Sequence, residues 1–306
     1  MIEKNIYQKA MEPWPDLLSS GNYIKLGAQN LQLFYYESGK NTNPTILMIH
    51  GLGDEADTWR HIIKPLSQNY HVIALDLPGF GRSTKPKRDY KPQFFMDTIV
   101  EFMSKLNIEK AVLMGSSLGA MLAHGIAIKN PEYVLGLILV GGSLLQTKRT
   151  QDRSLIIMSI PLVGEWLYNR LRKDPDAAYE SLSNVYYRLN VLPQIDRDFL
   201  YTRVNKRVWS DDQRRAYFST LRKLTPWIRK IQKSLPKLLT SVKLPTLLVR
   251  GEFDNLFLNE NAQSVANIQP FTTLASLKKS GHLPHQERPQ AFLVLIEKWL
   301  QGNLQK

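Results

Sequence analysis

The chain of 306 residues contains no cysteine. Disulfide bonds, thiolate metal sites and a thiol nucleophile are therefore excluded, and the composition suits a reducing cytoplasm. No stretch reaches the roughly 18 uncharged apolar residues of a membrane-spanning helix. Residues 1–9 lack the apolar core of a secretory signal. The sequence thus predicts a globular, cytoplasmic protein without a membrane span.

Acidic residues are scarce relative to basic ones. The chain has 40 Lys and Arg against 27 Asp and Glu, a formal net charge of +13 at pH 7. Residues 143–243 hold 20 basic and 9 acidic side chains, an excess of +11, so the remaining residues carry only +2. A basic middle segment between nearly balanced flanks predicts two parts with different surfaces.

Several continuous apolar runs are typical of strands buried on both faces. They span residues 45–50, 71–76, 111–114, 134–140, 245–250 and 273–277. Helical periodicity occurs at 58–66, 92–106, 259–268 and 289–300, and also directly after residue 117. Two shorter segments, 22–26 and 31–36, predict a hairpin around a turn at 27–30. Alternating strands and helices predict an α/β fold with a mostly parallel sheet flanked by helices.

The pattern changes at residue 143. From there to residue 237 the chain shows amphipathic helical periodicity and no run typical of a buried strand. The periodic segments are 155–171, 177–189 and 214–224. We therefore expect a core domain of residues 1–142 and 238–306, with residues 143–237 inserted as a helical cap over the strand ends.

Ser117 lies at the centre of Gly115-Ser-Ser-Leu-Gly119, between an apolar run and a helical pattern. This Gly-x-Ser-x-Gly pattern predicts a tight strand-to-helix turn that exposes the serine hydroxyl, because glycine removes two colliding Cβ atoms. The N–H groups that begin the next helix point at negative charge forming beside Ser117. Taken alone, the same five residues also fit an ordinary turn without chemistry.

Asp254 and His282 each follow the end of a later predicted strand. Ligands of open parallel sheets bind outside the carboxyl ends of the strands, where these side chains and Ser117 converge. A serine nucleophile needs a base, and the imidazole needs an acid that fixes its tautomer and stabilises its cation. Ser117, His282 and Asp254 supply these three groups. The alternatives are His285 as the base, Asp76 as the acid, and Asp254 as a simple helix cap.

These motifs resemble those of the α/β-hydrolase superfamily over residues 22–142 and 244–300. The matching segments are His50-Gly-Leu-Gly-Asp54, Asp76-Leu-Pro-Gly-Phe-Gly-Arg-Ser83, Gly115-Ser-Ser-Leu-Gly119, Gly251-Glu-Phe-Asp254, and Gly281-His282 with Glu287-Arg-Pro289 after it. The resemblance implies the α/β-hydrolase fold with a helical cap and the catalytic residues Ser117, Asp254 and His282. It also implies an oxyanion hole formed by the backbone N–H groups of Leu52 and Leu118. No cofactor is implied, and the histidines show no metal-ligand spacing.

Hydrolysis of carboxylic esters through an acyl-serine intermediate, as in esterases and lipases, is the reaction that the resemblance implies. Ser117 argues against the relatives that use aspartate there, the haloalkane dehalogenases and epoxide hydrolases. Carbon–carbon bond hydrolysis and cofactor-free perhydrolase activity stay open on the same triad. The loop 50–54 lacks the Gly-Pro-Gly form common in carbon–carbon bond hydrolases, which weakens the first of these. A ligand-binding protein without catalysis is the alternative from another class.

The expected partner is a small-molecule or lipid ester, whose specificity the cap should set. The aromatic side chains of the cap are interleaved with Lys and Arg. Three interpretations of this charge stay open: peripheral contact with an anionic membrane surface, selection of an acidic substrate by inward arginines, or a solvated helical face. No nucleic-acid partner is expected, because no recognition motif accompanies the charge.

Overall fold

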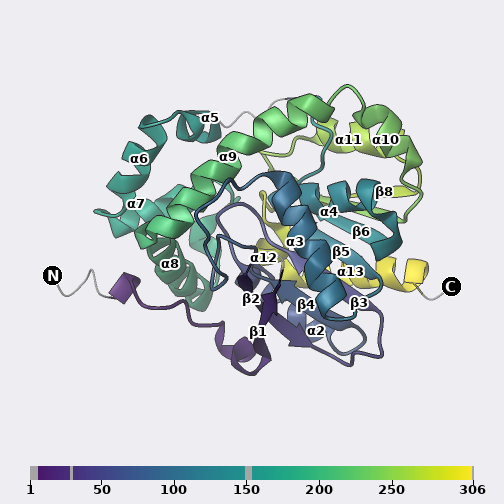
Figure 1. Ribbon diagram of the computed structural model, residues 1–306, viewed down its shortest axis with the longest axis horizontal. Helices are drawn as coiled ribbons and strands as arrows, with labels where there is room; N and C mark the ends of the chain where they lie inside the picture. The colour runs from purple at the N-terminus through teal and green to yellow at the C-terminus, as the bar shows by residue number, and fades with distance from the viewer. Residues whose placement is uncertain (1–5, 28–29, 149–153, 305–306) are drawn as a thin grey trace.

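The computed structural model describes residues 6–27, 30–148 and 154–304. Its centre is a sheet of eight strands: β1 (Gly21–Leu26), β2 (Leu31–Ser38), β3 (Thr45–Ile49), β4 (His71–Leu75), β5 (Ala111–Ser116), β6 (Val134–Val140), β7 (Thr246–Gly251) and β8 (Thr272–Leu277). Their spatial order is β1-β2-β4-β3-β5-β6-β7-β8 (Figure 1). β1 and β2 form an antiparallel pair, and β3 to β8 run parallel. The predicted hairpin is present, although residues 28–29 of its predicted turn lie outside the described residues.

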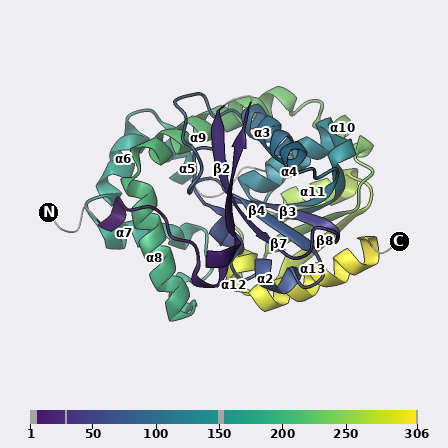
Figure 2. The ribbon, with the colours of Figure 1, turned by 60° about the horizontal axis from the view of Figure 1, so that its bottom comes forward.

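Helices cover both faces of this sheet (Figure 2). One face carries α3 (Pro92–Lys105), α4 (Leu118–Lys129), α10 (Leu235–Ser241) and α11 (Asn259–Ile268), and the other carries α2 (Ile63–Leu66) and α13 (Pro289–Leu304). Every residue of β3, β4 and β5 is buried. Strands enclosed on both faces need no polar side, which is why they occur as continuous apolar runs in the sequence. The predicted mostly parallel sheet flanked by helices is confirmed.

The parallel register brings the carboxyl ends of the central strands to one edge. Ile49 of β3 pairs with Gly115 of β5, and Ser116 at the end of β5 pairs with Val140 at the end of β6. Val140 in turn pairs with Val249 near the end of β7. The loops that leave these strands therefore start side by side, and this edge is where ligands of open parallel sheets bind.

Between β6 and β7 the described chain forms helices and turns only. The helices before α10 are α5 (Ser154–Ser159), α6 (Val163–Leu171), α7 (Pro175–Glu180), α8 (Gln194–Trp209) and α9 (Asp211–Ile231). They gather at one end of the molecule, on the left in Figures 1 and 2, and α9 crosses back towards the sheet. The apolar side of α9 packs on the core shared by α3 and α4. The predicted boundary at residue 237 falls inside α10, whose Leu235 and Leu239 are buried in that core.

Three predicted helices differ from the structure. The segment 155–171 is two helices, because Pro161 interrupts the pattern and the next residue, Leu162, has φ of 69°. The prediction for 177–189 is wrong beyond Glu180, where Ser181 donates to the Ala178 carbonyl in place of regular helical bonding. The segment 58–66 is helical only over Ile63–Leu66, after a short 3-10 turn at Ala56–Trp59.

The helices of residues 6–27, 30–148 and 154–304 include none with both the length and the apolar character needed to cross a bilayer.

Candidate active site

Ser117 occupies a strained turn between β5 and α4. Its backbone has φ of 52° and ψ of −112°, and its N–H donates to the Val140 carbonyl at 2.8 Å. The flanking glycines make this turn possible. A Cβ on Gly119 would lie 2.1 Å from the Ile49 carbonyl oxygen, and one on Gly115 would lie 2.3 Å from the Gly119 carbonyl. Glycine at both positions therefore lets α4 begin directly against β3, with the Ser117 side chain held at the turn.

The loop after β3 passes beside Ser117. A Cβ on Gly51 would lie 3.3 Å from the Ser117 Cβ. Nδ1–H of His50 donates to the Gly51 carbonyl at 2.7 Å, and His50 Nε2 accepts from the Leu77 N–H at 2.9 Å. His50 therefore fixes this loop through two hydrogen bonds. Within the described part of the chain, the N–H groups of Leu52 and Leu118 have no hydrogen-bond acceptor.

Asp254 and His282 form a direct pair between the loops after β7 and β8. His282 Nδ1 lies 3.0 Å from both carboxylate oxygens of Asp254, and both side chains are almost fully buried. Asp254 Oδ1 also accepts from the N–H groups of Leu256 and Phe257 at 2.9 Å. These three donors fix the carboxylate, and the pair fixes the imidazole with its proton on Nδ1. Nε2 of His282 is left as the acceptor.

Two consecutive glycines after β6 connect this pair to Ser117. A Cβ on Gly141 would lie 3.0 Å from His282 Nδ1, and a Cβ on Gly142 would lie 3.1 Å from the Ser117 Cα. The imidazole and the serine therefore pack on adjacent residues. His282 Nε2 is buried and has no hydrogen-bond partner among the described residues, so the bond from the Ser117 hydroxyl is not formed here. Hydrogen bonds of this kind often tighten only when substrate is present.

The His282 loop is attached to the helical segment 143–237 by Glu287. One Glu287 oxygen accepts from the Gly281 N–H at 2.6 Å and the other from the Tyr187 N–H at 2.8 Å. The His282 N–H itself donates to the Val185 carbonyl at 2.9 Å. Burial raises the pKa of Glu287 above its usual value. A hollow of about 290 Å³ opens here, lined by residues 183–186, Phe253, Asn255, Gly281 and His282.

Arg207 of α8 makes a second attachment, to the loop that carries Leu52. Its guanidinium donates to both oxygens of Glu55, at 2.7 and 2.9 Å, and also to Asp54. Burial alone would raise the pKa of Glu55, but Arg207 and Arg203 outweigh it and hold that pKa below its usual value. Glu55 is therefore a buried carboxylate whose charge depends on a helix more than 140 residues away in the chain.

The alternative site residues have other roles. Asp76 accepts from the Ala56 N–H at 2.7 Å and from the backbone and side chain of Arg82 at 2.7 and 2.8 Å, so it organises the turn after β4. His285 lies 3.0 Å from the Thr58 hydroxyl and packs on Trp59. Burial lowers the pKa of His285 well below its usual value. Among the described residues, no three His, Asp or Glu side chains are arranged to hold a metal ion.

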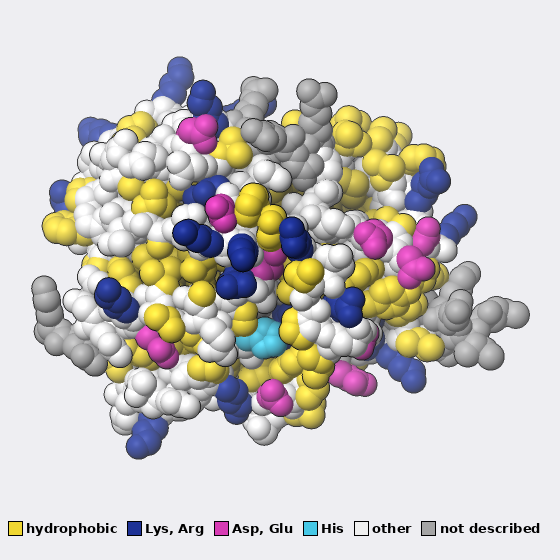
Figure 3. Space-filling view, turned by 180° about the vertical axis from the view of Figure 1, so that it is seen from behind, with side chains coloured by type: hydrophobic (Ala, Val, Ile, Leu, Met, Phe, Trp, Pro, Cys, Tyr) yellow, Lys and Arg dark blue, Asp and Glu magenta, His cyan; other side chains and the backbone are white. Residues whose placement is uncertain are grey.

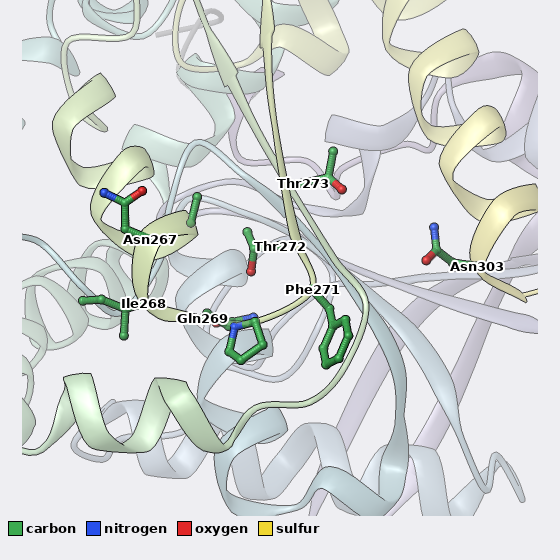
Figure 4. A pocket seen from close by; sticks show the side chains of 9 residues that line it. Asn267, Ile268, Gln269, Phe271, Thr272, Thr273 and Asn303 are labelled. Carbon is green, nitrogen blue, oxygen red and sulfur yellow. The ribbon is translucent and has the colours of Figure 1, made fainter.

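A larger hollow, of about 500 Å³, lies at the other edge of the sheet (Figure 4). It is lined by residues 266–273 and Asn303, around the amino end of β8. Its side chains are amides, hydroxyls and apolar groups, with no titratable group among them. Hollow size alone therefore does not identify the site, because Ser117, Asp254 and His282 lie at the carboxyl edge.

Arg207, Glu55 and the 185–187 segment were not foreseen from the sequence. Glu287 appeared there only as part of a motif, without a role. The one sequence signal for Arg207 was the adjacent pair Asp54-Glu55, which has no basic residue nearby in its own loop. Two neighbouring carboxylates at a strand end require a cation from elsewhere in the fold.

Comparison with known proteins finds a matching family and several similar proteins. The sequence profile of the alpha/beta hydrolase fold family matches residues 44–289. A 2-hydroxy-6-oxo-6-(2'-aminophenyl)hexa-2,4-dienoic acid hydrolase of Metapseudomonas resinovorans is 26% identical over 283 residues, covering 90% of each chain. Epoxide hydrolase 3 of Xenopus tropicalis is 25% identical over 305 residues, covering 92% of this chain and 78% of its own. A meta-cleavage product hydrolase of Pseudomonas fluorescens has a similar structure, with a TM-score of 0.76 at 22% identity over 93% of this chain and 99% of that one.

Proposed function

Because the chain belongs to the α/β-hydrolase fold family, whose relatives above are hydrolases, we propose that it is a serine hydrolase that cleaves carboxylic esters. One observation carries the proposal. The Asp254–His282 pair leaves a buried Nε2 acceptor, and this imidazole and the strained Ser117 pack on the adjacent residues Gly141 and Gly142. A base oriented by a carboxylate beside a serine hydroxyl is the arrangement that nucleophilic catalysis requires.

The reaction proceeds in two halves. His282 Nε2 takes the proton of Ser117 as Oγ attacks the ester carbonyl, and then gives it to the leaving alcohol. Water, deprotonated by the same nitrogen, attacks the acyl-serine and releases the acid and the free hydroxyl. Asp254 stays ionised and stabilises the imidazolium in each half.

The backbone N–H groups of Leu52 and Leu118 are the proposed oxyanion hole. The proposal is supported by the absence of an acceptor for either group in the described residues and by the approach of Gly51 to Ser117. Each donor aimed at the tetrahedral oxyanion is worth about 2.7–4 kcal/mol in such sites. Residues 143–237 are the proposed cap, and α9 with the segment 185–187 would shape the acyl and alcohol sites.

Carbon–carbon bond hydrolysis is the second candidate. It is favoured by the relative from Metapseudomonas resinovorans, named for a hexa-2,4-dienoic acid substrate, with which this chain shares 26% identity over 90% of its length. Epoxide hydrolysis is disfavoured despite the similarity to epoxide hydrolase 3, because position 117 holds a hydroxyl rather than a carboxylate.

The test is labelling with a fluorophosphonate, followed by turnover of p-nitrophenyl esters of rising chain length. We expect one label per chain, absent in Ser117→Ala, and measurable ester hydrolysis. A chain that is labelled but turns over only 2-hydroxy-6-oxo-hexa-2,4-dienoic acids would favour the second candidate. A folded chain that is neither labelled nor active on either class would refute the serine-hydrolase assignment.

Arg207→Met is expected to lower kcat for a p-nitrophenyl ester about 100-fold, with a much smaller change in KM. The substitution leaves Glu55 and Asp54 without their shared cation, so we expect the loop that carries Leu52 to shift. A misplacement of catalytic groups by about 1 Å lowers kcat by about 100-fold. Arg207 touches neither substrate nor the reacting atoms, and is a positioning residue. Steady-state kinetics measure the split between kcat and KM.

Arg207→Lys, which keeps the charge but loses the two-pronged contact, should fall between Arg207→Met and the unmodified protein. Arg172→Met is the matched control, because Arg172 pairs with the exposed carboxylate of Asp211. A folded Arg207→Met with unchanged kcat would limit Arg207 to a structural role.

A further inference from the structure

The helices α5 and α6 carry a cluster of exposed apolar side chains, here called the α5–α6 patch. It consists of Ile156, Ile157, Ile160, Leu162, Val163 and Trp166. These are six of the 14 large apolar side chains that are exposed in the described chain, and they fall within 11 consecutive residues. Figure 3 shows yellow side chains gathered at the upper right, at the end of the molecule where Figure 1 places α5 and α6. Such clustering marks a surface that contacts something.

Leu162 is exposed at a conformational cost. Its φ is 69°, a left-handed conformation that side chains with a Cβ rarely adopt, and its side chain is 82% exposed. The strained turn gains no burial within the chain in return. It does place Leu162 next to Val163 and one helical turn before Trp166, so the three side chains project from the start of α6 together.

The surroundings of the patch are basic. Arg170 is exposed and lies over the Trp166 ring, 5.0 Å from its centroid. The helix α9 packs against α5 through Arg222, which donates to the Ser159 carbonyl at 3.0 Å. The acidic residue within α6, Glu165, is neutralised by two hydrogen bonds of 2.7 Å from Arg222. An apolar surface with a Trp and an Arg at its margin and an excess of cations nearby suits the interface of an anionic bilayer.

We propose that the α5–α6 patch docks the protein on an anionic lipid surface, with Leu162 and Trp166 entering the headgroup region. Short helices with exposed apolar side chains bind such surfaces by apolar burial combined with attraction between Lys or Arg and anionic lipid. Docking through this end brings the helices α5 and α6 of the inserted segment against the membrane, and an ester held in the bilayer is then the expected substrate. Only this last consequence rests on the proposed function.

The experiment is vesicle co-sedimentation of the full chain in its Ser117→Ala form, which separates docking from hydrolysis. Vesicles of phosphatidylcholine and phosphatidylglycerol in equal parts should bind it, pure phosphatidylcholine should bind it more weakly, and added salt should weaken the binding. The double variant Leu162→Asn, Trp166→Ser should lower the partition coefficient about tenfold or more. Asparagine suits the positive φ at position 162, and thermal unfolding verifies that the variant is folded.

Phe271→Asn is the matched control. Phe271 also has a positive φ, 57°, and is 69% exposed, but it lies away from α5 and α6, directly before β8. Its substitution should leave vesicle binding unchanged. Equal binding by the double variant, or no binding of Ser117→Ala to either vesicle, would overturn the proposal. So would a dimer in sedimentation velocity that the double variant dissociates, because the patch would then bind a second copy of the chain.

Discussion

Ser117→Ala is expected to lower kcat for ester hydrolysis by about 10³- to 10⁶-fold, because the nucleophile of a triad cannot be replaced by its remaining members. The variant should fold normally. Alanine keeps the Cβ that Ser117 already places at φ of 52°, so the strain of the turn is unchanged. We expect the free energy of unfolding to change by less than about 1 kcal/mol. Kinetics on a p-nitrophenyl ester and chemical denaturation measure the two quantities.

The neighbouring residue provides the matched control. Ser116 is buried at the end of β5, and its hydroxyl makes no hydrogen bond among the described residues. Ser116→Ala therefore removes a hydroxyl one residue away from Ser117 while leaving the proposed triad intact. Its kcat should stay within about threefold of the unmodified protein, because the hydroxyl that is removed has no hydrogen-bond partner to lose. A strong loss of kcat in Ser116→Ala, together with full activity in Ser117→Ala, would mean that Ser116 rather than Ser117 is the nucleophile.

The triad members should also behave as a unit. His282→Ala alone, and His282→Ala combined with Ser117→Ala, should lose about as much kcat as Ser117→Ala alone, because the groups act in one step. Losses that multiply would mean that the two residues act independently. The pair contact of His282 with Asp254 would then have only a structural role.

The sheet and its active edge were predictable because their signals are local. A strand buried on both faces must be apolar throughout, as at residues 45–49 and 71–75. The turn at Ser117 needs glycine at 115 and 119 for a steric reason that the structure quantifies, with a Cβ on Gly119 only 2.1 Å from the Ile49 carbonyl. Parallel register then brings the strand ends together, so the Asp254–His282 contact follows from topology.

The attachments of the helical segment could not be derived in this way. Arg207 and the Tyr187 N–H contact loops of the core only because α8 and the 185–187 segment pack where they do. Amphipathic periodicity predicts that a helix exists, but not which loop it covers. Local competition also changed the helices themselves: Pro161 divides one predicted helix, and the Ser181 hydroxyl bonds to the Ala178 carbonyl where another was expected to continue. The predictable features thus have local causes, whereas these attachments depend on tertiary packing.

Arg82→Met is expected to destabilise the fold by about 3–5 kcal/mol, the cost of breaking buried ion pairs by removing one partner. Arg82 donates to Asp57 at 2.5 Å, to Asp76 at 2.8 and 3.0 Å, and to the Tyr36 hydroxyl at 2.8 Å. Both carboxylates are at most 1% exposed. Methionine fills similar volume but supplies no charge, so Asp76 loses its cation and Asp57 keeps only the longer ion pair with Arg203 at 3.4 Å. Urea denaturation at pH 7 measures the change.

The loss of stability in Arg82→Met should depend on pH. Burial would raise the pKa of Asp76, but Arg82 outweighs burial and holds that pKa below its usual value. In the unmodified protein this carboxylate therefore stabilises the fold at neutral pH. The stabilisation is lost only as the pH falls through the lowered pKa of Asp76 in the folded state. Without Arg82, burial dominates and the pKa of Asp76 rises above its unfolded value. The variant then loses stability as the pH rises, and the difference between the two proteins should shrink from pH 7 towards about pH 4.

The control for Arg82→Met is Lys223→Met, which breaks the ion pair with Asp89 at 3.0 Å, where both side chains are well exposed. That pair should contribute at most about 1 kcal/mol. Adding Asp57→Asn to Arg82→Met removes the negative charge beside Asp76 and should recover part of the lost stability. A loss of less than about 1 kcal/mol in Arg82→Met, unchanged between pH 7 and pH 4, would mean that the two carboxylates are not stabilised through Arg82.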